Sequence, residues 1–348
     1  MKAVAILGER NVALVEREKP QLHDGEVLLK IHYVGFCGSD LNTYLGKNPM
    51  VKLPVIPGHE IAARVEAVGA GVPESIRPGM SCTVNPYTNC GHCSSCRNGR
   101  PNACRFNQTL GVQRDGAMCE YIAVPWQKVI ADDTLTLRQF ALVEPMSVGF
   151  HAVSRARTTD LDVVMVIGCG MIGVGAIVRA ALRGARVIAV DVDDDKLKLA
   201  QELGAHYTIN SATEDVHARV QEITGGAGPD VVVEAVGAPV TYQMAINEVG
   251  FTGRVVCIGY AKKETSFETK YFVMKEMDIR GSRNAMREDF RAVIEYLKRF
   301  SADVVKLISG ARERDVVQKV SAVSSVPRKE LLKANKSTQK PVITEDFL

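Results

Sequence analysis

The chain has 348 residues, 46% hydrophobic and 24% charged, which is the composition of an ordinary globular protein long enough for two domains. Its formal net charge of +3, without a Lys/Arg run, argues against a nucleic-acid partner. The N-terminal apolar run is too short for a signal peptide, and no window approaches the roughly 18 apolar residues of a membrane span. Nine cysteines, an odd number, fit a reducing compartment, so we expect a cytoplasmic protein without a membrane partner.

The first 150 residues contain short strand-like runs that are separated by Gly and Pro. Examples are Glu26–Tyr33, Ile61–Val68 and Glu120–Val124. Runs of this length and composition predict a largely antiparallel, barrel-like domain over residues 1–150.

A cluster of four cysteines, Cys90, Cys93, Cys96 and Cys104, lies within this domain, in a lobe of about residues 86–106. Thiolates two residues apart allow a tight turn to bring both sulfurs to one ion, and a fourth sulfur completes a tetrahedron. Four cysteines leave no open coordination position, so the pattern predicts a structural zinc. Two disulfides, or reduced thiols without a metal, are the alternatives.

From Leu161 onward the pattern changes to strand-length apolar runs that alternate with helix-length segments. The runs V-V-M-V-I-G and A-R-V-I-A-V-D are followed by the segments Gly173–Arg183 and Asp194–Leu203. The runs Asp230–Val236 and Arg254–Gly259 continue the alternation. Continuous Val/Ile runs between helices predict an α/β domain with a parallel, doubly wound sheet.

A G-x-G-x-x-G motif, Gly168 to Gly173, lies between the first of these strands and its helix. Gly168 permits the tight turn, Gly170 lets the backbone approach a pyrophosphate, and Gly173 lets the helix pack closely on the sheet. Asp191 ends the next strand, 18 residues after Gly173, where a carboxylate accepts hydrogen bonds from ribose hydroxyls and repels a 2′-phosphate. The motif therefore predicts NAD rather than NADP. A glycine-rich turn in a nucleotide-free sheet is the alternative.

We expect the cofactor to be contacted by the motif and by residues at the ends of the later runs. The cofactor-binding candidates are Gly168, Gly170, Met171, Ile172, Gly173, Asp191, Val236, Gly259 and Arg283.

Three further potential metal ligands are far apart in the sequence. They are Cys37 in G-F-C-G-S-D, His59 in P-G-H-E and Glu144 in V-E-P-M. Spacing alone does not bring them together, and a single Cys or His is more often structural than a ligand.

In combination and in this order, the motifs resemble the zinc-dependent medium-chain alcohol/polyol dehydrogenase family over nearly the whole chain. The resemblance implies a GroES-like β-rich catalytic domain at residues 1–150 that is completed by residues 291–348. A Rossmann NAD-binding domain at residues 151–290 would lie between the two segments. It also implies a homodimer or homotetramer that acts on a small molecule.

The resemblance identifies Cys37, His59 and Glu144 as ligands of a catalytic zinc, so two zinc ions per chain are expected. It leaves open whether Glu60 or Glu144 takes the third position. Such a zinc acts as a Lewis acid that lowers the pKa of a bound alcohol, whose hydride then passes to the nicotinamide.

By the same resemblance, Ser39 begins a proton relay and Asp40 orients the histidine ligand. A turn serine and a helix cap are the alternative interpretations of these two residues. Many relatives have an ionisable histidine where this chain has Asn42, so the exit of the proton is unassigned, and His151 is a weak candidate.

The expected reaction converts a secondary alcohol of a polyol or sugar acid to a ketone with NAD+. Glu144 in place of cysteine, and the stretch G-S-R-N-A, resemble sorbitol dehydrogenases and the L-galactonate and L-gulonate 5-dehydrogenases. Arg283 and Asn284 are candidates for binding the substrate, and Arg283 could pair with the carboxylate of a sugar acid. Alternatively, Arg283 anchors the cofactor or a subunit interface.

An L-threonine 3-dehydrogenase-like enzyme and a non-catalytic nucleotide-binding scaffold are the competing functions. The segment Ser321–Leu348 has little apolar periodicity and departs from the family pattern, so the sequence does not decide whether a final strand forms there.

Overall fold

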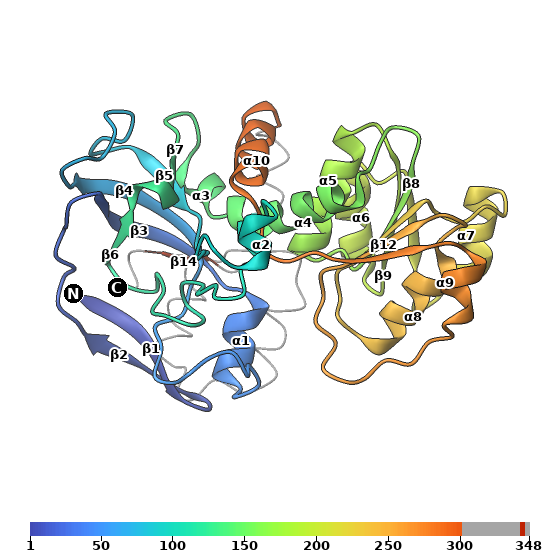
Figure 1. The fold of residues 1–348 in the computed structure, drawn as a ribbon, viewed down its shortest axis with the longest axis horizontal. Helices are drawn as coiled ribbons and strands as arrows, with labels where there is room; N and C mark the ends of the chain where they lie inside the picture. The colour runs from blue at the N-terminus through green and yellow to red at the C-terminus, as the bar shows by residue number, and fades with distance from the viewer. Residues whose placement is uncertain (301–341, 345–348) are drawn as a thin grey trace. The chain divides into compact units, whose positions relative to one another are not determined.

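The computed structural model describes residues 1–300 and 342–344. The chain divides into two compact units. The first unit comprises Met1–Glu144 and Met286–Leu348, and the second comprises Pro145–Ala285 (Figure 1). Most of the segment that departs from the family pattern therefore lies outside the described residues.

The first unit is built from antiparallel strands. Strands β1 and β2 form a two-stranded sheet, and the larger sheet has the order β14-β3-β4-β5-β7, with β6 also paired to β3. The sequence prediction of a mainly antiparallel domain is confirmed. The strands are β1 (Lys2–Gly8), β2 (Asn11–Glu16), β3 (Glu26–Gly35), β4 (Glu60–Val68), β5 (Ser81–Val84), β6 (Tyr121–Pro125), β7 (Val129–Ala131) and β14 (Val342–Thr344).

Strand β3 occupies the centre of this sheet. Its first half pairs with β6 and its second half with β14, while β4 runs along its other edge. Side chains such as Val27, Leu29 and Ile31 alternate into one apolar core. The final strand that the sequence left open is present, because Val342–Thr344 pairs with Tyr33–Gly35.

Among the residues that the structure describes, the helices of the first unit are short apart from α10. They are α1 (Gly38–Tyr44), α2 (Ser94–Arg97), η1 (Pro101–Ala103), η2 (Trp126–Lys128), α3 (Leu137–Phe140) and α10 (Arg287–Arg299). The amphipathic helix α10 buries Phe290, Val293 and Leu297.

The second unit contains an all-parallel sheet of six strands. The order is β10-β9-β8-β11-β12-β13, so the order reverses between β8 and β11, where dinucleotides bind in doubly wound folds. The predicted parallel, doubly wound sheet is confirmed. Its strands are β8 (Val163–Ile167), β9 (Arg186–Asp191), β10 (Tyr207–Asn210), β11 (Val231–Glu234), β12 (Arg254–Cys257) and β13 (Asp278–Gly281).

Each face of this sheet packs into its own apolar core, since alternate residues of β8 belong to different clusters. Val164 and Val166 belong to one core, and Met165 and Ile167 belong to the other. All five residues of β8 are buried, which explains its continuous Val/Ile run. The helices are α4 (Val143–Ala156), α5 (Met171–Leu182), α6 (Asp194–Glu202), α7 (Val216–Thr224), α8 (Pro239–Glu248) and α9 (Lys270–Met274).

Within the described residues, every helix is too short or too polar to cross a lipid bilayer.

Candidate metal centres and cofactor site

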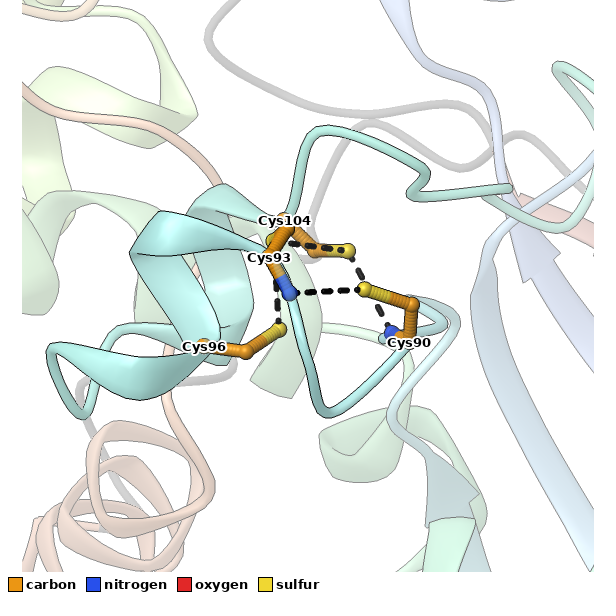
Figure 2. Close-up of side chains that lie close together, drawn as sticks. All are labelled: Cys90, Cys93, Cys96 and Cys104. Carbon is orange, nitrogen blue, oxygen red and sulfur yellow. Dashed lines mark hydrogen bonds between the residues drawn. The ribbon is translucent and has the colours of Figure 1, made fainter.

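The four cysteines of the lobe converge on one point. Their sulfur atoms all lie within 4.8 Å of one another, and Figure 2 shows them around the short helix α2. Cys93 is the N-cap of this helix and Cys96 lies inside it, so one helical turn brings their sulfurs to 3.5 Å. Cys104 follows the turn η1 and places its sulfur 3.7 Å from that of Cys93.

This group fits zinc better than disulfides. All nine cysteines are unbridged, and the sulfur separations are far longer than the roughly 2.05 Å of a disulfide bond. Backbone N–H groups of Cys90, Cys93 and Phe106 donate to the sulfurs. A hydrogen bond from the Ser95 hydroxyl, helped by backbone N–H groups, lowers the pKa of Cys93 to about 5. Burial raises the pKa of Cys96 to about 11, so the geometry of the four sulfurs, rather than their pKa values, supports a four-sulfur zinc site.

A second group of potential ligands forms in the same unit from Cys37, His59 and Glu60. One ligand atom from each lies within 4.8 Å of the others. Cys37 is the N-cap of α1, and His59 and Glu60 lie at the start of β4. Sulfur, imidazole and carboxylate from three residues are typical of a catalytic zinc that keeps one position open. The residues therefore fit a zinc ion.

Asp40 lies next to this group, and its side chain is almost completely buried. Its carboxylate accepts hydrogen bonds from the backbone N–H groups of Cys37 (2.9 Å) and Gly58 (3.3 Å). It lies 3.9 Å from His59 Nδ1, which is too far for a hydrogen bond. Asp40 caps α1, as one interpretation of the sequence had it, and its orienting of the histidine stays a prediction. Burial raises its pKa despite the nearby His59.

The electrostatics of the group favour a cation. Burial opposes a charge on His59, but Cys37, Asp40 and Glu144 outweigh it and hold the pKa of His59 well above its usual value. A site that favours a positive charge on the imidazole also favours a metal cation in its place. Two buried atoms beside it, Ser39 Oγ and His59 Nδ1, make no hydrogen bond within the described residues.

Glu144 lies outside the group of three ligand atoms, although it acts electrostatically on His59. The hydroxyl of Tyr87 donates a hydrogen bond to Glu144 Oε1. Tyr87 is buried and packs edge-on against Phe290 of α10, with ring centroids 6.4 Å apart. In this structure Glu60, rather than Glu144, is the carboxylate next to Cys37 and His59.

No motif in the sequence indicates the involvement of Tyr87 or of Gly35. Gly35, the last residue of β3, pairs in register with Glu60, and its missing side chain leaves room for the glutamate. A Tyr three residues before Cys90 and a Gly two residues before Cys37 are informative only once the tertiary contacts are known.

The glycine-rich turn of the second unit has the geometry expected of a phosphate cradle. Gly168 has φ of 94° in the left-handed region, and Gly170 is the exposed N-cap of α5 with open space beside its Cα. A Cβ on Gly173 would overlap the carbonyl oxygen of Gly168, so helix and turn meet through glycine. Met171 is buried and Ile172 half-buried in the first turn of this helix. The cradle fits a dinucleotide pyrophosphate.

Asp191 connects the end of β9 to this turn. Its carboxylate accepts hydrogen bonds from the backbone N–H groups of Cys169 (2.7 Å), Val192 (2.8 Å) and Asp193 (3.2 Å). Lys196 Nζ lies 3.8 Å from Asp191 Oδ1, a cation that the sequence analysis did not consider. The hydrogen bonds fix the position of the Asp191 carboxylate, and the positive charge of Lys196 offsets part of its negative charge.

The remaining candidates also follow strands of the parallel sheet. Val236, half-exposed, follows β11, and Gly259 follows β12. Arg283 and Asn284 follow the edge strand β13, and Asn284 has φ of 56°. Residues after parallel strands share one edge of the sheet, so all four lie at the edge that carries Gly168.

Comparison with known proteins identifies the class. Residues 23–133 match the alcohol dehydrogenase GroES-like domain, and residues 172–299 match the zinc-binding dehydrogenase domain. The chain belongs to the zinc-type alcohol dehydrogenase family, as the motifs had indicated. Its first unit is therefore GroES-like and its second Rossmann-like.

Several relatives resemble the chain over most of its length. It is 36% identical to an uncharacterized zinc-type alcohol dehydrogenase-like protein of Haemophilus influenzae, over 83% of this chain and 84% of the relative. It is 31% identical to L-galactonate-5-dehydrogenase of Escherichia coli, with 89% and 94% covered. It is 33% identical to sorbitol dehydrogenase of Bacillus subtilis, with 81% of each covered.

Solved structures give the same class. An alcohol dehydrogenase of Escherichia coli in complex with NADH is 28% identical, with a TM-score of 0.85 and 99% of both chains covered. A zinc-binding dehydrogenase of Sinorhizobium meliloti bound to NADP is 29% identical, with a TM-score of 0.78 and 85% and 87% covered. Neighbours thus carry either nicotinamide cofactor.

Proposed function

We propose that this chain is a zinc-dependent oxidoreductase that transfers a hydride from a secondary alcohol of a polyol or sugar acid to NAD+, giving the ketone. The observation that supports this most strongly is the convergence of the Cys37, His59 and Glu60 ligand atoms within 4.8 Å. The similarity to L-galactonate-5-dehydrogenase and sorbitol dehydrogenase supports the substrate class.

We assign the catalytic centre to the first unit. Cys37 and His59 would hold a zinc ion with Glu60, and Glu144 would be an alternative carboxylate ligand in another state of the site. Zinc supplies Lewis acidity that lowers the pKa of an alcohol hydroxyl. The buried Ser39 hydroxyl, which lacks a hydrogen-bond partner among the described residues, is available to accept the proton that leaves the alcohol. Asp40 would keep His59 in place through the ends of α1 and β4.

The lobe of Cys90, Cys93, Cys96 and Cys104 would hold the second zinc. Because the four thiolates fill a tetrahedron, that ion would stabilise the lobe and take no part in the reaction.

We assign the cofactor to the second unit. The exposed backbone at Gly170 and the N-terminus of α5 would bind the pyrophosphate. Asp191 would accept hydrogen bonds from the adenosine ribose and disfavour a 2′-phosphate, which supports NAD. Val236, Gly259 and Arg283 would lie along the rest of the cofactor.

Arg283 is also our candidate for recognising the carboxylate of a sugar acid, with Asn284 beside it. Replacing Arg283 with Ala should then raise KM for an aldonate far more than KM for a neutral polyol. Equal changes for both substrates would contradict this role.

Three further expectations stay predictions. They are the domain boundaries at residues 150 and 290, a homodimer or homotetramer, and a reducing compartment for the unbridged cysteines.

A substrate screen tests the proposed function. The purified protein, with its zinc content measured, is incubated with NAD+ or NADP+ and with L-galactonate, L-gulonate, sorbitol or L-threonine, and the reduced cofactor is followed by absorbance. We expect activity on an aldonate or polyol with NAD+, and loss of this activity in Cys37→Ser with one zinc retained. Activity on threonine alone would favour an amino-alcohol enzyme. A protein that binds only the lobe zinc and reduces nothing would be a scaffold.

A further inference from the structure

Glu234 is a carboxylate in the core of the second unit that the proposed reaction does not use. It ends β11 and is completely buried. It pairs in register with Ile167 of β8, directly before the glycine-rich turn. Burying an ionisable side chain costs free energy unless the side chain is well hydrogen-bonded. The hydrogen-bond partners of Glu234 therefore indicate its role.

One oxygen of Glu234 organises the loop that follows β11. Oε1 accepts hydrogen bonds from the backbone N–H groups of Val236 (2.9 Å) and Gly237 (2.8 Å) and from the hydroxyl of Thr241 (2.7 Å). The same hydroxyl is 2.8 Å from the carbonyl oxygen of Ala238. A single carboxylate oxygen thereby fixes the loop and the first turn of α8.

The second oxygen lies under the loop that follows β12. A Cβ on Gly259 would be 2.8 Å from Glu234 Oε2 and 2.5 Å from the Cα of Gly237. The backbone carbonyl of Glu234 accepts from the N–H groups of Ile258 (2.9 Å) and Gly259 (3.3 Å). The two loops therefore pack directly on each other, glycine against glycine, around this side chain.

Oε2 is itself buried and has no hydrogen-bond partner within the described residues. Leaving a buried carboxylate oxygen unpartnered costs free energy. Nearby, the hydroxyl of Tyr242 donates to the carbonyl of Gly259 (2.5 Å), and burial together with Glu234 raises the pKa of Cys257 to about 11. That cost is set against the three hydrogen bonds that Oε1 accepts from the loop.

We propose that Glu234 is a positioning residue for the cofactor. It holds the loops Ala235–Ala238 and Ile258–Tyr260 in one arrangement, and so places Val236 and Gly259 for the dinucleotide. This inference rests on the proposed use of a nicotinamide cofactor. The loop that carries Val236 also lies over the glycine-rich turn, because a Cβ on Gly168 would be 2.6 Å from Val236 Cγ2. Displacement of the loop would therefore also disturb the glycine-rich turn that we assign to the pyrophosphate.

The test compares the affinity of the full chain for NADH, measured by calorimetry, across matched variants. Glu234→Ala removes an acceptor of three hydrogen bonds, so we expect Kd to rise about tenfold or more. Glu234→Gln keeps a carbonyl oxygen in the place of Oε1, and we expect Kd within about threefold of the parent. Glu248→Gln, which changes another buried glutamate that contacts His217, should leave Kd unchanged.

Hydrogen exchange in the free protein gives a second readout. Amides of Val236, Gly237 and Gly259 should exchange faster in Glu234→Ala and not in Glu234→Gln, while the zinc content stays that of the parent. Thr241→Val removes one of the three donors to Glu234 and keeps the carboxylate. If Glu234→Ala does not fold, this variant tests the positioning role in its place. We expect about a threefold rise in Kd for that variant.

The outcomes separate this inference from the proposed function. A folded Glu234→Ala that binds NADH as tightly as the parent would overturn the positioning role. Equal weakening in Glu234→Ala and Glu234→Gln would overturn it too, because charge rather than loop geometry would then be responsible. Failure of the parent protein to bind either NADH or NADPH would instead contradict the proposed function.

Discussion

Gly35 and Glu60 face each other across β3 and β4, and the side chain of the glutamate occupies the space that any other residue would need at position 35. A Cβ on Gly35 would lie 2.9 Å from Glu60 Cβ and would overlap Oε2. Gly35 does not have a positive φ, so its backbone conformation suits alanine. The glycine is required here for space and not for conformational freedom.

We therefore expect Gly35→Ala to displace the Glu60 carboxylate and to weaken metal binding at Cys37 and His59. Zinc analysis after dialysis should fall toward one ion per chain, held by the cysteine lobe. Gly8→Ala is a matched control, because its nearest neighbour, Asn11 Cβ, would be 3.9 Å away. Full zinc retention in Gly35→Ala would show that Glu60 is not needed for the second ion.

Tyr87 holds Glu144 through a hydrogen bond, and loss of its hydroxyl should release the carboxylate. Tyr87→Phe removes a hydrogen-bond donor to a buried carboxylate, so we expect the metal-free protein to lose about 1–3 kcal/mol of stability. Added zinc should raise the melting temperature of Tyr87→Phe more than that of the parent, since Glu144 is then free to turn toward the ion. Glu144→Gln in the Tyr87→Phe background is the control. The same zinc-induced rise with and without this second change would argue that Glu144 is not a ligand.

Cofactor choice should depend on the pair of Asp191 and Lys196. Asp191→Asn preserves the shape of the side chain and removes its charge, which leaves Lys196 as a local cation. We expect the preference for NADH over NADPH to fall by about tenfold in this variant. Adding Lys196→Gln should restore part of the preference. Unchanged Kd values for NADPH in Asp191→Asn would mean that Asp191 does not exclude the 2′-phosphate.

The attachment of α10 should depend on pH. Lys298 of α10 lies 2.7 Å from Asp132, just after β7. Burial opposes ionisation of Asp132, but hydrogen bonds from Lys298 and Thr134 outweigh it and lower its pKa below the usual 3.8. The stability that the carboxylate contributes is therefore present above pH 3.8 and is lost as the pH falls through the lower folded-state value.

Asp132→Asn should accordingly destabilise the protein by about 1 kcal/mol at neutral pH and much less near pH 3, as measured by urea unfolding. The comparison variant is Asp133→Asn. Its partner Arg77 is exposed, so little change is expected at either pH. Equal destabilisation by Asp132→Asn at both pH values would exclude the ion pair as the cause.

The sequence predicted features that depend on local spacing. The Val/Ile runs specified the parallel sheet, the turn from Gly168 to Gly173 specified the phosphate cradle, and the four cysteines specified their own cluster. Each of these signals lies within a few residues, so it is visible without knowledge of tertiary contacts.

Contacts between distant segments could not be predicted in this way. Tyr87 meets Glu144 across 57 positions, and the role of Gly35 depends on the register between two strands. The resemblance left open whether Glu60 or Glu144 takes the third ligand position, and the structure brings Glu60 together with Cys37 and His59. Lys196 belongs to no motif, so only the structure shows that its Nζ lies 3.8 Å from Asp191.

The pairing of β14 with β3 has a consequence for the synthesis of the protein. The strand that ends at Gly35 receives its partner Val342 only from the other end of the chain. A ribosome therefore releases the whole of the parallel sheet before it releases the last strand of the GroES-like sheet. We expect the nucleotide-binding unit to fold first on the nascent chain, and the part of β3 that pairs with β14 to stay unpaired until residues 342–344 have been synthesised.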